Sequence, residues 1–268
     1  MDKIPAMENI RAAAVAGSFY PADPTELRKQ LDALLPAVAN NTKSPKAMIL
    51  PHAGYLYSGS IAASGYARLA DDRIAISRVV LLGPTHQKYV CGMAVPSASA
   101  FSTPLGVVPL DIDALQMLVQ LDQVSIDDAA HAAEHCLEVH LPFLQKMLQD
   151  FTLVPVLVGE ASAEAVCEVI ELLWGGDETL IIISSDLSHF HDYDTATQLD
   201  QLTSRAIESL AFETIDHHAA CGSGPISGLL LYARQHKLHL KTIDLRNSGD
   251  TAGPRDRVVG YGAYILTD

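Results

Sequence analysis

Short apolar runs alternate with helix-like segments along most of this chain. Residues 238–245 and 258–266 alternate apolar and polar positions and are predicted to be the last two strands. Other runs are apolar throughout, which is typical of strands in a sheet covered on both faces. They lie at residues 47–50, 79–82, 152–158 and 179–183. Strands separated by helices favour an α/β fold with a central, mainly parallel or mixed sheet covered by helices.

The segments between the strands have helical periodicity. The clearest helix start is Asp23, a capping residue followed by Pro24 and by Glu26 three positions after the cap. Leucines then follow at helical spacing. Further helices are predicted at residues 58–70, 111–121, 138–148, 161–173, 195–210 and 223–236. We see no internal repeat, low-complexity tract or linker, so we expect residues 1–268 to form a single domain.

Charge and cysteine content exclude several classes of protein. The chain has 18 Lys and Arg against 32 Asp and Glu, a formal charge of −14, so neither nucleic acid nor a membrane surface is an expected partner. Residues 1–16 include Asp2, Glu8 and Arg11, and no run approaches 18 apolar residues, so we expect a cytoplasmic protein. The four cysteines form no C-x-x-C pair, which disfavours a disulfide scaffold or a zinc ribbon.

Histidine is the residue that stands out, with 11 copies, and three of them follow predicted strands. His52 follows the first apolar strand, His86 the second, and His189 the fourth, where Asp186 also lies. In open α/β sheets ligands bind beyond the carboxyl ends of the strands. These side chains are therefore predicted to share one rim, where histidine can ligate a metal or transfer protons.

Cys221 is a further candidate because it directly precedes a predicted helix. The positive end of a helix dipole favours the thiolate, so we expect a lowered thiol pKa. A thiolate is a soft ligand for Zn, Fe or Cu. The alternative is a small buried hydrophobic residue followed by turn-forming glycines.

A dense polar cluster contains Glu134, His135, Glu138 and His140. It matches neither the H-E-x-x-H nor the H-x-x-E-H pattern of metalloproteases. Carboxylates commonly orient ligand histidines. We therefore expect these four residues to support metal ligands or to contact substrate, with direct ligation as one alternative and a solvated helix start as another.

Five other histidines lack a preceding strand end and are expected to have no functional role. They are His191, His217, His218, His236 and His239.

Several ordered motifs resemble the Memo family, and in particular its prokaryotic branch, the AmmeMemoRadiSam system protein B group. They span about residues 13–266 and comprise Pro51-His52-Ala53-Gly54-Tyr55, Leu82-Gly83-Pro84-Thr85-His86, Glu134-His135-x-x-Glu138-x-His140, Ser184-Ser185-Asp186-Leu187-Ser188-His189 and Cys221-Gly222-x-x-Pro225. The fold of that family is similar to the fold of class III extradiol dioxygenases, which use non-haem Fe(II).

The resemblance implies a role for each rim residue. It implies metal ligation by His52, His86 and Cys221, and acid/base chemistry by His189 with Asp186 nearby. The dioxygenases have a glutamate in place of the cysteine, so the resemblance does not imply ring cleavage. A thiolate ligand favours Cu or Zn, or alters the redox behaviour of Fe.

These inferences together predict a metal-dependent redox enzyme that holds Fe(II) or Cu and acts on O2 or an unknown small molecule. Three protein ligands leave a coordination position for such a molecule. A zinc-dependent hydrolase with the same residues is one alternative. The other is a non-catalytic scaffold that partners radical-SAM and AMMECR1-type proteins, which the resemblance to a system component implies.

Overall fold

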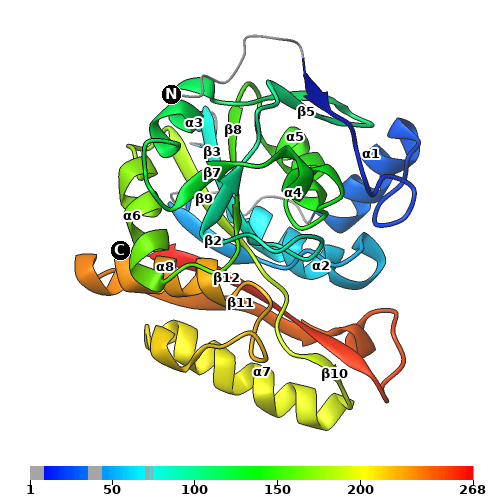
Figure 1. The fold of residues 1–268 in the computed structure, drawn as a ribbon. Helices are drawn as coiled ribbons and strands as arrows, with labels where there is room; N and C mark the ends of the chain where they lie inside the picture. Colours follow the sequence, from blue (N-terminus) through cyan, green and yellow to red (C-terminus); the bar gives the residue numbers. More distant parts are fainter. Residues whose placement is uncertain (1–8, 36–43, 70–72, 74, 268) are drawn as a thin grey trace.

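The computed structural model describes residues 9–35, 44–69, 73 and 75–267. Asp2, Glu8 and the final residue of the helix predicted at 58–70 lie outside these residues. The structure confirms the predicted α/β class, with a mixed sheet and helices on both of its faces (Figure 1).

Nine strands form the main sheet within the described residues, in the order β10-β12-β2-β9-β3-β8-β4-β7, with β11 paired to β12. The pairs β2/β9, β9/β3 and β3/β8 are parallel. The β12 strand pairs antiparallel with β2, β10 and β11. These strands are β2 (Ala47–Leu50), β3 (Arg78–Pro84), β4 (Met93–Val95), β7 (Val124–Ile126), β8 (Thr152–Val158), β9 (Thr179–Ser184), β10 (His189–His191), β11 (His239–Asn247) and β12 (Val258–Thr267).

A smaller sheet has the order β1-β5-β6 and lies outside the main one. Its strands are β1 (Ile10–Arg11), β5 (Ala100–Thr103) and β6 (Gly106–Pro109). None of the three was predicted, nor were β4, β7 and β10 of the main sheet. With two to four residues each, they are too short to show a period.

Helices cover both faces of the main sheet (Figure 1). The helices α6 and α8 pack together, with α8 against β3 and β9, while α2 lies against β2, β11 and β12 beside α1 and α5. The α7 helix lies along β11 and β12. Their bounds are α1 (Pro24–Leu34), α2 (Tyr55–Tyr66), α3 (Ile112–Leu118), α4 (Asp128–Ala132), α5 (Leu141–Met147), α6 (Ala163–Leu173), α7 (Tyr193–Glu208) and α8 (Ser223–His236).

Local chemistry accounts for the predicted helix starts. The carboxylate of Asp23 accepts the backbone N–H groups of Thr25 and Glu26, 2.8 and 2.9 Å away, and α1 begins at Pro24 as predicted. The helix predicted at 138–148 is a 3-10 turn, η2 (Glu138–His140), that continues into α5.

The order of the central strands places the carboxyl ends of β2, β9 and β3 side by side. This edge is where the candidate histidines were expected to meet.

Candidate metal centre

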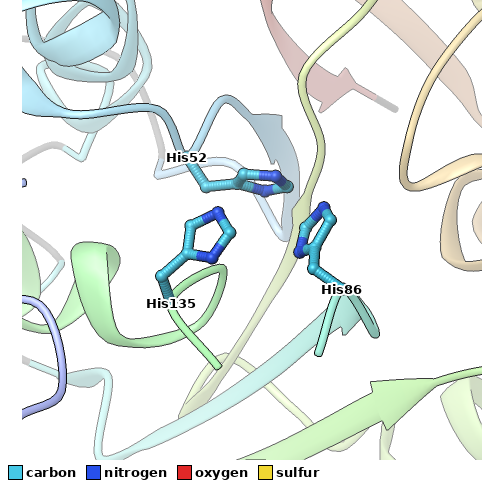
Figure 2. A group of neighbouring side chains, drawn as sticks. All are labelled: His52, His86 and His135. Carbon is cyan, nitrogen blue, oxygen red and sulfur yellow. The ribbon is translucent and has the colours of Figure 1, made fainter. Parts of the chain in front are cut away.

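Three histidine rings meet at the carboxyl edge of the sheet. His52 follows β2, His86 follows β3, and His135 lies in the loop between α4 and η2. One ring nitrogen of each lies within 4.8 Å of the others. Figure 2 shows the rings turned toward one another. The structure thus brings His52 and His86 together as the strand-end pattern predicted, and it adds His135 as a third candidate ligand.

Cys221 offers a sulfur donor beside His52, outside the group of three histidines. Its Sγ lies 3.4 Å from Nε2 of His52. A sulfur and a nitrogen bound to one tetrahedral metal, at about 2.3 and 2.0–2.1 Å, lie about 3.5 Å apart. Imidazole and thiolate donors suit Zn, Cu and Fe and not Mg²⁺ or Ca²⁺. The residues therefore fit a transition metal.

Buried hydrogen bonds fix the proton positions on two histidines. The Oγ of Ser184 donates to the carbonyl oxygen of Cys136 at 2.7 Å, which uses its one proton. Nδ1 of His52 at 2.7 Å and Nε2 of His140 at 3.0 Å must therefore donate to that oxygen. Nδ1 of His140 then accepts from the Tyr66 hydroxyl at 2.9 Å. This arrangement leaves the Nε2 lone pair of His52 directed at the candidate metal position.

Glu134 orients the other two histidines. Its Oε1 accepts from Nδ1 of His86 at 2.9 Å and lies 3.2 Å from Nδ1 of His135. Burial opposes ionisation of Glu134, but hydrogen bonds from the ring and backbone N–H of His86 outweigh it and hold its pKa at about 2. An ionised carboxylate only accepts hydrogen bonds, so the His86 ring carries its proton on Nδ1. Its Nε2 atom remains free to bind a metal.

Burial keeps His52 and His135 neutral. It lowers the pKa of His52 well below its usual range, and the neighbouring histidines reinforce the effect. Burial also lowers the pKa of His135. His86 and His135 remain accessible, with 28% and 17% of their side chains exposed. Neutral imidazoles are the form that binds metals.

The expected low pKa of Cys221 is wrong for the metal-free site. Burial and the nearby Asp186 raise the pKa of this thiol to about 12, despite a backbone N–H of Asp186 directed at the sulfur 3.3 Å away. Cys221 precedes Gly222, the cap of α8, so the helix dipole does not overcome the loss of water. The thiol is therefore protonated at neutral pH without a metal.

Asp186 and His189 both lie near the cluster. Oδ1 of Asp186 accepts the backbone N–H of His52 at 2.8 Å, and Oδ2 lies 4.0 Å from Nε2 of the same residue. Burial raises the pKa of Asp186 to about 7. Nδ1 of His189 donates to the carbonyl of Leu187 at 2.7 Å, so its Nε2 is the basic nitrogen. Burial lowers the pKa of His189 and keeps it neutral.

The carboxylate of Glu138 contacts the N-terminal segment and not the histidine rings. Its buried carboxylate pairs with Arg11 and accepts from the Tyr20 hydroxyl at 2.6 Å. It also accepts backbone N–H groups of residues 14 and 15. These bonds hold the N-terminal segment whose Phe19 ring packs 4.7 Å from the ring of His135. Glu138 thus acts on the site through that segment.

Sequence reasoning assigned no role to Ser184 or Tyr66. Ser184 is the last residue of β9 and directly precedes the strand-end motif, so its position in the sequence could have indicated a role. No feature of the sequence near Tyr66 indicates one. Two of the histidines expected to have no role, His217 and His218, pack against each other with ring centroids 3.9 Å apart.

The fold and the clustered donors define a class of protein: an α/β domain with a histidine- and cysteine-lined site at the carboxyl edge of its sheet. A model of the Memo-like protein family matches residues 11–265. A MEMO1 family protein of Sulfolobus acidocaldarius is 36% identical, with 94% of this chain and 97% of the relative covered. One from Aquifex aeolicus is 35% identical over 96% and 99% of the two chains, and one from Methanosarcina barkeri is 34% identical over 96% and 100%. The chain belongs to the Memo family.

None of the described helices is long and apolar enough to cross a membrane.

Proposed function

We propose that this protein is a metal-dependent oxidoreductase that holds Fe(II) or Cu at His52, His86 and Cys221. The observation that carries the proposal is the convergence of His52 and His86 with His135, with Sγ of Cys221 3.4 Å from Nε2 of His52. The hydrogen bonds of Ser184 and Glu134 leave the Nε2 lone pairs of His52 and His86 free. The bound metal would supply redox chemistry toward O2 or a small organic substrate. His135 is either a fourth ligand or a contact for the substrate.

The protein residues would perform the remaining tasks. His189 is neutral and its Nε2 is free, so it can accept a proton from a substrate bound near His86. Asp186 holds the backbone of His52 and lies beside Cys221, so it positions two ligands at once. Glu134 keeps the rings of His86 and His135 oriented.

Metal analysis of protein purified without oxygen tests the proposal. We expect the wild type to hold about one metal ion per chain. His52→Ala, His86→Ala and Cys221→Ala should each lose most of it, because each removes a ligand. His236→Ala is the matched control, since its ring stacks on Tyr232, 4.1 Å between centroids. Full metal content in two of the three ligand variants would exclude this site.

The identity of the metal separates redox chemistry from hydrolysis. Fe or Cu with a thiolate-to-metal charge-transfer band that disappears in Cys221→Ser supports an oxidoreductase. Zinc as the sole metal, with no such band, would instead favour a hydrolase, in which the metal lowers the pKa of a bound water. His135→Ala in the same series tests whether this ring is a ligand. Loss of a ligand should reduce metal content as far as His86→Ala does, whereas loss of a substrate contact should leave it unchanged.

A further inference from the structure

A cleft of about 580 Å³ opens beside the candidate metal centre. Its size falls in the usual range for sites that bind small molecules. His135 and the nearly buried Asp186 line its inner end. Four aromatic side chains from separate parts of the chain also line it: Phe19, Tyr57, Phe190 and Tyr261.

Phe190 forms one wall of this cleft in a costly backbone conformation. Its φ is 65°, a region that bulky residues rarely occupy, and 61% of the residue is exposed. It lies where the register between β10 and β12 shifts, between His189 and His191. Such irregularities redirect side chains next to functional sites. Here the shift is paired with an exposed aromatic ring on the cleft wall, an arrangement that folding alone does not favour.

Arg257 lies over this ring at the outer part of the cleft. Its guanidinium carbon is 4.4 Å from the centre of the Phe190 ring, and the residue is exposed. Arg11, Arg78, Arg234 and Arg246 each pair with a carboxylate. Within the described part of the chain, Arg257 makes no such pair. It is also the one cationic side chain among the lining residues, so its N–H donors remain available to a ligand.

We propose that this cleft binds a planar aromatic carboxylate, with its ring against Phe190 and its carboxylate on Arg257. Guanidinium groups bind carboxylates through paired N–H donors, and aromatic rings pack well on aromatic walls. Arg257 is exposed at the cleft entrance and Asp186 is buried at the inner end, so the ligand's carboxylate is held at the entrance. The other end of the ligand then faces His135 and the candidate ligands. This orientation rests on the proposed function, whereas binding itself does not require a metal.

The test uses 2-naphthoate and its uncharged analogue 2-naphthamide, titrated into metal-free protein and followed by ligand-observed NMR. We expect wild type to bind the carboxylate about tenfold more tightly than the amide, which is the typical contribution of a charge-assisted hydrogen bond. Arg257→Gln should reduce this ratio to about one, and Arg257→Lys should retain part of it. Phe190→Ala should weaken both ligands severalfold and leave the ratio unchanged.

Arg255→Gln is the matched control. Arg255 lies two residues away on the same loop and stacks on Tyr193 at the same 4.4 Å, but it does not line the cleft. The inference is wrong if wild type binds neither probe, if it binds both equally, or if the ratio survives Arg257→Gln. Metal content is measured separately on wild type. A selective cleft in a protein that takes up no metal would refute the proposed function alone, and metal uptake without selectivity would refute this inference alone.

Discussion

Replacing Ser184 by alanine tests the hydrogen-bond network that prepares the candidate metal centre. Ser184 is fully buried, and its hydroxyl joins three groups that are also shielded from water. It accepts from His52 and His140 and donates to the carbonyl of Cys136. In Ser184→Ala, two ring N–H groups and one carbonyl oxygen lose this partner.

The expected loss of stability follows from these contacts. A buried polar group without a partner costs about 1–3 kcal/mol, so three such groups set an upper range of about 3–9 kcal/mol. His52 can reduce the cost by moving its proton to Nε2, where Sγ of Cys221 lies 3.4 Å away. We therefore expect the metal-free variant to lose about 3 kcal/mol of unfolding free energy.

Moving the His52 proton to Nε2 should also weaken metal binding. A proton on Nε2 occupies the lone pair that the metal requires, so the affinity for metal should fall about 10- to 100-fold. Urea unfolding followed by the fluorescence of Trp174, the single tryptophan, measures stability. Competition with a chelator measures metal affinity. Nitrogen-15 NMR of the imidazoles reports the tautomers directly, with Nδ1–H on His52 and Nε2–H on His140 in wild type.

Ser204→Ala is the control for these measurements. Its buried hydroxyl bonds the hydroxyl of Thr242 at 2.9 Å and contacts none of the candidate ligands. We expect a loss of about 1 kcal/mol and unchanged metal affinity. If Ser184→Ala keeps wild-type affinity for metal, or if His52 carries its proton on Nε2 in wild type, the assignment of the tautomer is refuted.

Three further predictions follow from the same structure. Gly222→Ala should weaken metal binding at least tenfold, because its Cβ would lie 2.7 Å from the backbone oxygen of Ser184 and displace the adjacent Cys221. Gly224→Ala is the control and should be tolerated, since its Cβ meets only Val158 at 3.3 Å. Equal metal affinities of the two variants in a titration would contradict this prediction. Because the Cys221 thiol has a pKa raised to about 12, a bound metal must displace its proton. The affinity for metal should therefore rise about tenfold per pH unit between about pH 7.5 and 9, and Cys221→Ala should lose this dependence. A flat wild-type profile would show that the sulfur is not a ligand. Burial lowers the pKa of His131 to about 4, so on acidification the unfolded chain is protonated before the folded one. The stability of wild type relative to His131→Gln should therefore fall by about 1.4 kcal/mol per pH unit as pH drops from about 6.5 to 4. A difference in urea unfolding that stays constant over this range would refute the lowered pKa of His131.

Much of the fold could be predicted from local pattern. The strands β2, β3, β8 and β9 were located because their residues are apolar throughout, and the start of α1 was located because Asp23 caps it. Short strands such as β10 were missed, since three residues carry no period. The irregularity of β10 that exposes Phe190 was therefore missed as well.

The candidate site, like the fold, could be predicted only in part. The sequence by itself determined that His52, His86, Asp186 and His189 follow strand ends, because a chain that must bury apolar strands brings their carboxyl ends to one edge. Only the tertiary structure decided that Ser184 bonds His52 from 132 positions away, that His135 joins the cluster, and that the Cys221 thiol has a raised pKa. The physical reason is that tautomers and pKa values depend on which distant groups exclude water and supply hydrogen bonds, and local sequence does not contain that information.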